Sequence, residues 1–268
     1  MNPSLPRLLA NGLFEVIAAP NLVERIRRIE SLVSGRLVFT TSFGIEDQAL
    51  THALVEAGSR AEIVTLDTGR LFPETYDAWV ETEDKLGIRI RAFAPERGSE
   101  EDFVARRGIN GFRHSLDARQ ECCGFRKVEP LRRALAGAAV WYTGLRSGQS
   151  AHRAETPIAQ PDAHHGLIKI NPLADWTRED CDRYVYDRSV PYNVLHDRGF
   201  PSIGCAPCTR AVRIGEPERA GRWWWEQEAK KECGLHLPHS ERDATIDTGD
   251  EAAAFESPSD ATRVKEMV

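Results

Sequence analysis

The sequence predicts an α/β protein built on a doubly wound, mainly parallel sheet. Four short runs rich in β-branched and apolar residues have the length and composition of buried strands, at residues 36–41, 61–66, 88–94 and 138–143. Helical patterns separate them over 46–57 and over 73–86, where Pro73 stands at the first helical position. Because strands that alternate with helices form parallel sheets, the segments after Thr41, Leu66 and Thr143 are expected to meet at one ligand-binding crevice.

The second half of the chain predicts a helix over 177–187, an irregular Pro-, Gly- and Cys-rich segment over 190–213, and a helix over 218–231. After Pro238 large apolar residues are scarce, which predicts a disordered tail. The expected division is an N-terminal helical segment (1–34), one α/β domain (35–237) and an acidic tail (238–268).

Composition narrows the class of protein. The chain has 268 residues, of which 41% are hydrophobic and 28% are charged, as in ordinary globular proteins. It has no apolar run near the roughly 18 residues that a membrane span needs, and its N-terminus does not resemble a signal peptide. A cytoplasmic location is therefore expected. The net charge of −6 comes mostly from the C-terminal tail, so no broad basic surface for nucleic acid is expected.

Six cysteines in a cytoplasmic protein point to metal binding or thiol chemistry, because that compartment keeps thiols reduced. The adjacent pair Cys122-Cys123 and the pair Cys205-x-x-Cys208 make up four thiolates, which suit either zinc or a [4Fe–4S] cluster. Two adjacent cysteines reach separate iron corners more easily than one zinc ion, which favours the cluster without excluding zinc. Cys181, inside a predicted helix, is interpreted as a core residue.

Cys233 differs from the other cysteines because it follows Lys230 and Lys231 near the end of the predicted domain. Neighbouring cations favour the thiolate, and an exposed position would let this sulfur reach both a substrate and a partner. An ordinary exposed thiol is the alternative interpretation.

Several loops are candidates for binding an anionic nucleotide. The segment from Ser42 to Asp47 connects a strand to a helix, where backbone N–H groups attract anions, and residues 66–75 combine an acid, a Gly turn, a cation and a proline. Cations are supplied by the Gly-rich loop 144–150, by Lys127, and by Arg219 and Arg222 at helical i, i+3 spacing. Ordinary loop connections, neutralisation of the cysteine site and solvated surface arginines are the alternatives.

Taken together, these motifs resemble the assimilatory adenylyl-sulfate (APS) reductases, relatives of the phosphoadenylyl-sulfate (PAPS) reductases in the adenine-nucleotide α-hydrolase-like fold. The resemblance covers about residues 37–236 and rests on SFGIEDQ, LDTGRLFPET, Cys-Cys followed by Arg-Lys, TGLRSGQS, Cys-x-x-Cys and ECGLH. The stretch 150–153 departs from the Ser-Pro-Thr-Arg of many relatives, which makes Arg153 a less secure ligand than Arg146.

The resemblance implies a thioredoxin-dependent reduction of APS to sulfite and AMP, in sulfate assimilation and cysteine biosynthesis. Cys233 would be the nucleophile that forms an S-sulfonate, and thioredoxin or a similar dithiol protein would release sulfite. The four paired cysteines would bind a [4Fe–4S] cluster. The implied substrate-binding residues are Ser42, Gly44, Leu66, Thr68, Lys127, Gly144, Arg146, Arg219, Arg222 and His236.

Three other functions compete with this interpretation. A PAPS reductase or a dual APS/PAPS reductase is the nearest, although relatives without the two cysteine pairs are the ones that usually prefer PAPS. An ATP-dependent RNA thiolation enzyme of the same fold needs a fuller Gly-rich loop than residues 42–47 supply. A non-catalytic redox sensor leaves Cys233 and the arginines unexplained. The sequence does not distinguish a monomer from a homo-oligomer.

Overall fold

The computed structural model describes Val16 and residues 18–226, and it contains a six-stranded sheet in the order β3-β2-β1-β4-β6-β5. The strands are β1 (Arg36–Thr41), β2 (Glu62–Leu66), β3 (Arg91–Phe93), β4 (Ala138–Tyr142), β5 (Ala159–Asp162) and β6 (Leu167–Ile170). Every pairing is parallel except that of β5 with β6, an edge hairpin that the sequence patterns did not predict. The expected α/β fold with a mainly parallel sheet is confirmed.

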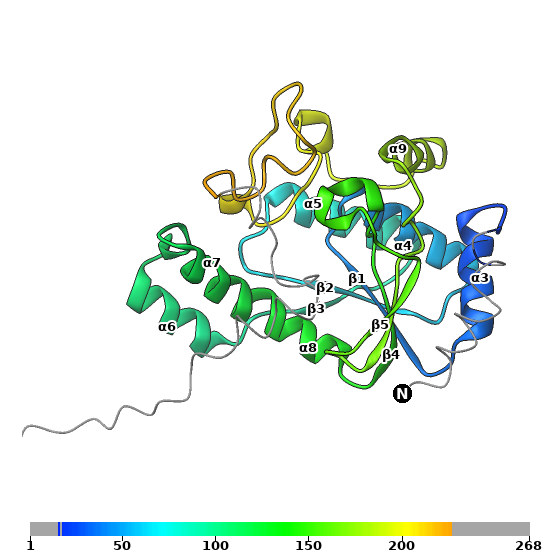
Figure 1. The fold of residues 1–268 in the computed structure, drawn as a ribbon, viewed down its shortest axis with the longest axis horizontal. Coiled ribbons are helices and arrows are strands. Elements are labelled where there is room, and N and C mark those ends of the chain that lie inside the picture. The colour runs from blue at the N-terminus through cyan, green and yellow to red at the C-terminus, as the bar shows by residue number, and fades with distance from the viewer. Residues whose placement is uncertain (1–15, 17, 227–268) are drawn as a thin grey trace, which may run out of the picture.

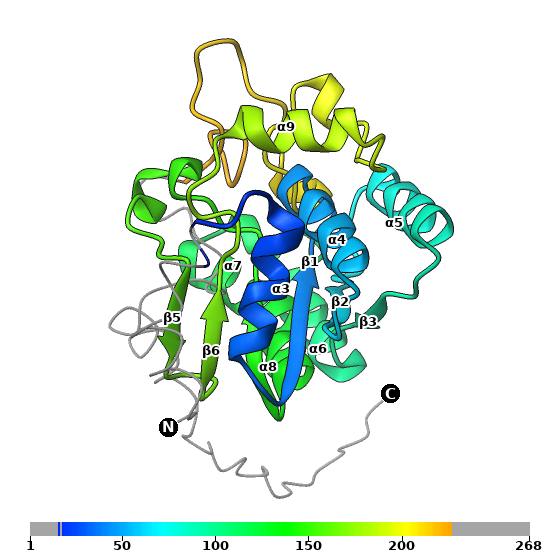
Figure 2. The same ribbon diagram turned by 90° about the vertical axis from the view of Figure 1, so that its right-hand side faces the viewer.

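The α-helices of the described residues cover both faces of the sheet (Figure 2). They are α3 (Leu22–Leu32), α4 (Ile45–Ala57), α5 (Pro73–Leu86), α6 (Arg97–Arg107), α7 (Leu116–Cys123), α8 (Glu129–Leu135) and α9 (Arg178–Asp187). None of these helices is long and apolar enough to cross a membrane. The helices predicted over 46–57, 73–86 and 177–187 correspond to α4, α5 and α9, and Cys181 is buried on α9 as expected.

Alternation along the strands divides the core into two layers. Leu37 and Phe39 of β1 pack in the cluster that includes α3 and α4, whereas Val38 packs in the cluster that includes Leu131 of α8. Successive side chains of a strand point to opposite faces, so a continuous apolar run can bury both of its faces. This burial fixes the strand ends, and therefore the loops that follow them.

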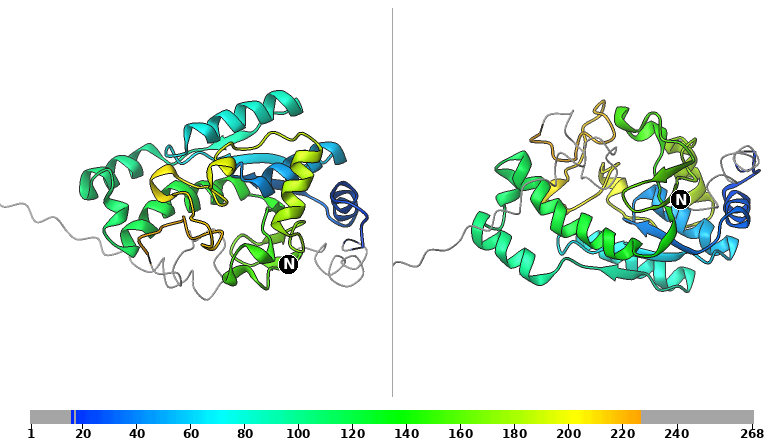
Figure 3. Two further views of the ribbon diagram at one scale, coloured as in Figure 1. Left: turned by 90° about the horizontal axis from the view of Figure 1, so that it is seen from above. Right: turned by 60° about the horizontal axis from the view of Figure 1, so that its bottom comes forward.

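The segment from 190 to 226 passes over the carboxyl ends of the parallel strands, above the sheet in Figures 1 and 2 and between α5 and α7 in Figure 3. It is irregular, apart from short 3₁₀ turns such as Ala206–Cys208. The helix predicted over 218–231 is wrong for its described part, 218–226. Arg222 instead forms an isolated antiparallel bridge with Thr209, and Trp223 has a φ of 40°. The backbone N–H of Trp223 donates to the carbonyl of Cys208 at 3.0 Å, so tertiary pairing replaces local helix formation.

Candidate active site and cysteine cavity

A pocket lies at the carboxyl ends of β1, β2 and β4, where the sheet topology predicts a ligand site. Its walls come from the loops after these strands and from residues 201–204 and 218–222. Eight of the residues that the sequence nominated for substrate binding line it: Ser42, Gly44, Leu66, Thr68, Lys127, Gly144, Arg219 and Arg222. Segments far apart in the sequence therefore meet in one cavity.

The loop between β1 and α4 is held by its own side chains. Asp47 accepts hydrogen bonds from the backbone N–H and the hydroxyl of Ser42, at 2.6 and 2.7 Å. Phe43 has a φ of 60°, which is unusual for a residue other than glycine, and its buried ring stacks on Trp79. This packing turns the chain so that Gly44, the N-cap residue of α4, lies at the edge of the pocket.

Gly144 is required where the loop after β4 meets the start of α4. A Cβ atom at this position would lie 2.2 Å from an oxygen of Asp47 and 3.2 Å from the Cβ of Glu46. No side chain fits at that separation, so glycine permits the two loops to pack together.

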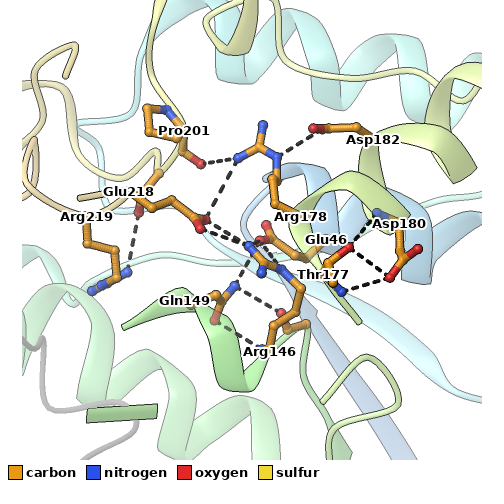
Figure 4. A network of polar contacts seen from close by, with 12 residues as sticks. Glu46, Arg146, Gln149, Thr177, Arg178, Asp180, Asp182, Pro201, Glu218 and Arg219 are labelled. Carbon is orange, nitrogen blue, oxygen red and sulfur yellow. Dashed lines mark hydrogen bonds and ion pairs between the residues drawn. The ribbon is translucent and has the colours of Figure 1, made fainter. Parts of the chain in front are cut away.

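Arg146 lies beside the pocket in a buried ion-pair network (Figure 4). Its Nε donates to Glu46 at 2.9 Å, and its Nη2 donates to both oxygens of Glu218 at 2.9 and 3.1 Å. The Arg146 side chain is only 2% exposed. Arg178 of α9 approaches Glu218 at 3.8 Å. The pocket lining includes both carboxylates but not Arg146, so this arginine holds the pocket wall together.

The network also shifts the proton affinities of its two carboxylates. Burial acts to raise the pKa of Glu46, but Arg146 and the hydrogen bond from Gln149 outweigh it and hold that pKa below its ordinary value. The pKa of Glu218 is raised by burial and by the nearby Glu46. Glu46 therefore remains the ionised partner of Arg146.

Four cations line the pocket: Lys127, Arg153, Arg219 and Arg222. Arg219 and Arg222 both donate to the hydroxyl of Ser202 at 3.3 Å, and Arg222 also donates to the carbonyl of Ile203 at 3.1 Å. A Cβ at Gly204 would lie 2.2 Å from a guanidinium nitrogen of Arg222, so a side chain there would displace that guanidinium group. The two arginines converge through these loop contacts and not through a shared helix face.

A second cavity adjoins the first and contains the four paired cysteines. Cys122 and Cys123 reach it from the end of α7, and Cys205 and Cys208 reach it from the Ala206–Cys208 turn and the residue before it. None of the four forms a disulfide within the part of the chain that the structure describes. Across Val16 and residues 18–226, no three His, Cys, Asp or Glu side chains converge closely enough to hold a single metal ion. All four cysteines nevertheless line one cavity.

The cysteine cavity is rich in positive charge. Its lining includes the cations Arg70, Arg119, Arg126, Lys127 and Arg222. The hydroxyl of Thr68 lies 3.3 Å from the sulfur of Cys205. Burial acts to raise the pKa of Cys205, but Lys127 and Thr68 outweigh it and lower that pKa. Burial and the charge of Cys205 raise the pKa of Cys208 to about 12. Fixed cations at this position suit a group with a net negative charge.

Three buried N–H donors on residues that line this cavity have no hydrogen-bond partner within the part of the chain that the structure describes: Trp223 Nε1, Arg222 Nε and Arg126 Nε. A buried donor without an acceptor costs about 1–3 kcal/mol. Three such donors on residues that line the four-cysteine cavity are consistent with a bound group that carries acceptors. A sulfur-rich group held by the cysteines would supply sulfide and thiolate acceptors, so the residues present fit an iron–sulfur cluster.

Lys127 and Arg222 line both cavities, which makes them the link between the pocket and the cysteine site. Lys127 belongs to a turn of π-helix (Gly124–Val128) directly after α7, a geometry that is often found at functional sites. The nominated residues Cys233 and His236 lie outside the described residues. Their placement therefore stays a prediction.

Sequence reasoning missed the carboxylates that line the pocket, Glu46, Asp47 and Glu218. Glu46 and Asp47 stand inside the SFGIEDQ motif, where two acids at the first turn of a helix are a detectable signal. Glu218 has no such signal, because its partners Arg146 and Arg178 are distant in the sequence.

We expect the pocket to bind anions more tightly below pH 6 than at neutral pH. Burial raises the pKa of Asp47 to about 6, with Glu46 raising it further and Arg153 and Ser42 opposing the rise. Protonation then removes a negative charge from the lining, worth about 1 kcal/mol or five-fold in affinity. Titration of Cys233→Ser protein with a sulfated nucleotide at pH 7.5 and 5.5 measures this. Asp47→Asn is expected to bind more tightly at pH 7.5 and to lose most of the pH dependence; an unchanged dependence contradicts the assignment to Asp47.

Comparison with known proteins agrees with this architecture. Residues 36–211 match the model of the phosphoadenosine phosphosulfate reductase domain family. The chain is 53% identical to the adenosine 5′-phosphosulfate reductase of Agrobacterium fabrum over 86% of this chain and 88% of that protein. It is 49% identical to the enzyme of the same name from Allochromatium vinosum, over 83% of this chain and 85% of the relative.

A solved structure shares the fold. The phosphoadenylyl-sulfate (PAPS) reductase of Candida auris, crystallised as a phosphate complex, superimposes with a TM-score of 0.62 at 26% identity, covering 75% of this chain and 94% of that one. The sequence match and the common fold identify the chain as a member of the phosphoadenosine phosphosulfate reductase domain family.

Proposed function

We propose that this chain is a thioredoxin-dependent APS reductase, which converts APS to sulfite and AMP through an S-sulfonate on Cys233. The observation that carries the proposal is the pair of adjoining cavities, an anion pocket and a four-cysteine cavity, that share Lys127 and Arg222. The names of relatives at 49–53% identity support APS as the substrate. Cysteines that form no disulfide within the described residues also support a cytoplasmic location.

In the proposed first step, the thiolate of Cys233 attacks the sulfur of APS. A sulfur–sulfur bond forms, the bond from that sulfur to the phosphate oxygen breaks, and AMP leaves with the electron pair. Lys127, Arg219 and Arg222 would hold the phosphate and sulfonyl oxygens, whose charge grows as the bond breaks. Cations fixed in advance stabilise this transition state without reorganisation.

In the second step, one thiol of a dithiol protein attacks the Cys233 sulfur and sulfite departs with the bonding electrons. The second thiol of the partner then resolves the mixed disulfide and restores Cys233. The partner is thereby oxidised by two electrons, which balances the reduction of the sulfonyl group to sulfite. Thioredoxin is the proposed partner because it presents such a dithiol.

Cys122, Cys123, Cys205 and Cys208 would hold a [4Fe–4S] cluster. Four protein thiolates leave no open iron position, so the group would supply a fixed local charge and a structural link. The chain's own residues then do the chemistry near the substrate. Lys127, which faces both cavities, would orient the sulfonyl group.

Metal analysis tests this ligand set. Wild-type protein is expected to contain about four irons per chain and no stoichiometric zinc. Cys205→Ser is expected to lose most of the iron because a ligand is removed, whereas Cys181→Ser, which changes a cysteine outside the cavity, is expected to retain it. One zinc per chain would refute the cluster.

Mass spectrometry tests the reaction itself. Incubation with APS in the absence of a dithiol is expected to add the mass of SO₃ to the peptide that contains Cys233. Absence of that adduct from protein with intact iron would refute the mechanism. Adding thioredoxin is then expected to remove the adduct and release one sulfite.

Substrate choice needs a separate comparison. The pocket lining has three carboxylates, Glu46, Asp47 and Glu218, beside its four cations, which disfavours the additional phosphate of PAPS. Sulfite release is therefore expected to be faster with APS than with PAPS at equal concentrations. Equal efficiency would favour a dual reductase.

A further inference from the structure

Arg119 of α7 forms a buried ion pair with Glu226, the last residue that the structure describes. Its Nε and Nη2 donate to the two carboxylate oxygens, both at 2.9 Å. The two side chains are 1% and 9% exposed. Paired N–H···O bonds of this kind fix both position and orientation, and burial protects them from screening by salt. Glu226 is therefore tightly attached to α7.

The same guanidinium group lies at the cysteine cavity. Arg119 lines this cavity together with Cys122 and Cys123, and its Cζ lies 4.8 Å from the centre of the Trp223 ring. Burial acts to lower the pKa of Arg119, but Glu226 and the negative charge of Cys123 outweigh it and raise that pKa. Arg119 thus interacts both with Cys123, a proposed cluster ligand, and with Glu226 at the end of the described chain.

Glu226 also determines where the chain departs towards Cys233, which comes seven residues later. Seven extended residues span at most about 25 Å. Because Glu226 is fixed, the sulfur of Cys233 can reach only a limited volume around Glu226. The effective concentration of this sulfur at any site within that volume is therefore higher. Releasing Glu226 enlarges this volume and lowers that concentration.

We infer that Arg119 is a positioning residue, which anchors the start of the Cys233 segment to the helix that carries Cys122 and Cys123. The inference rests on the proposed function, in which Cys233 is the nucleophile. The end of α7 would then have two roles. It would supply the proposed cluster ligands Cys122 and Cys123, and through Arg119 it would fix the start of the segment that leads to Cys233. Arg119 is not part of the pocket lining and, in this scheme, does not contact the substrate.

Single-turnover sulfonation of Cys233 by APS, measured on the full-length, iron-loaded protein, tests the inference. Arg119→Met is expected to slow sulfonation about two-fold, because the tether to Cys233 then begins at Trp223, which stays hydrogen-bonded to Cys208, and is about ten residues long instead of seven. Affinity for AMP is expected to equal that of wild type, since the cations of the pocket are unchanged. Glu226→Gln, whose amide oxygen still accepts one hydrogen bond, is expected to slow sulfonation by a smaller factor than Arg119→Met.

The rate of iron release to a chelator distinguishes loss of the anchor for the Cys233 segment from a general destabilisation of the cysteine site. Arg119→Met removes a cation beside Cys123 and is expected to release iron faster. Glu226→Gln leaves that cation in place and is expected to release iron no faster than wild type, although sulfonation is slowed. Arg106→Met is the matched control. Arg106 of α6 pairs at 2.7 Å with Glu121 of α7, the helix that also carries Arg119, but the Arg106 side chain is largely exposed. This variant is expected to leave both rates unchanged.

The outcomes distinguish this inference from the proposed function. If wild-type protein forms no sulfonate on Cys233, the proposed function fails and the inference fails with it. If wild type is sulfonated and Arg119→Met reacts equally fast, or loses AMP affinity in the same proportion, the inference alone is refuted. Should Arg119→Met not fold, Glu226→Gln decides: a wild-type sulfonation rate in that variant refutes the anchor, and a slower rate with unchanged iron release supports it.

Discussion

Replacing Cys233 with serine is expected to reduce sulfite release by roughly 10⁴-fold or more, the scale of loss seen when an enzyme's nucleophile is removed. A serine hydroxyl is not ionised at neutral pH, and it cannot form the S-sulfonate from which a dithiol displaces sulfite. Affinity for APS is expected to stay within about two-fold of wild type, because the pocket lining among the described residues holds the binding cations. Sulfite assays and equilibrium binding measure the two effects separately.

Cys181→Ala is the matched control for this substitution. Cys181 is a buried thiol of the α9 core, where burial raises its pKa far above the ordinary value and keeps it protonated. Its loss is expected to leave sulfite release near the wild-type rate. Sulfite production by Cys233→Ser at even a tenth of the wild-type rate would contradict the role of Cys233, whatever metal the protein contains.

Replacing Arg146 with methionine is expected to lower the free energy of unfolding by about 3–5 kcal/mol. This is the usual cost of removing one partner from a buried ion pair. The substitution leaves Glu46 and Glu218 facing each other without the guanidinium that separates them. At about 2–4 °C per kcal/mol for a domain of this size, the melting temperature is expected to fall by roughly 10 °C. Urea and thermal unfolding measure both quantities.

Two further variants show whether the network is the cause. Arg97→Met breaks an Arg–Glu pair in which both side chains are largely exposed, and such pairs contribute about 0–1 kcal/mol. The double variant Arg146→Met/Glu218→Gln is expected to recover part of the lost stability, because one unpaired carboxylate is removed. A fall of less than about 1 kcal/mol in Arg146→Met, or no recovery in the double variant, would contradict the role of the network.

The position of Arg146 in the structure shows how far a sequence motif can assign a role to a residue. The sequence nominated Arg146 as a substrate ligand from its place in a Gly-rich loop after a strand, and the structure places it in an ion pair with Glu46 and Glu218. Glu218 comes from the same irregular segment as Arg219 and Arg222. The loop pattern indicates that a cation stands near the pocket, but it does not specify which anion faces it.

The pattern of apolar residues along the sequence was sufficient to predict most of the α/β scaffold. Apolar runs and helical spacing predicted four of the six strands and the helices α4, α5 and α9, because burial of a strand or a helix face imposes its period on consecutive residues. Spacing alone likewise identified the four cysteines as one set. The short hairpin of β5 and β6 escaped this reasoning, since four-residue strands carry too little pattern to be recognised.

The sequence by itself determined the parallel α/β scaffold, the edge of the sheet that carries the pocket, and the cysteine pairs that belong together. Only the tertiary structure decided that residues 218–226 are not helical, that Arg146 is buried between two carboxylates, and that Lys127 and Arg222 face both cavities. The physical reason is the range of the interactions. Periodicity reflects neighbours a few residues apart, whereas an ion pair joins whichever residues the fold brings together, here positions 72 to 107 apart.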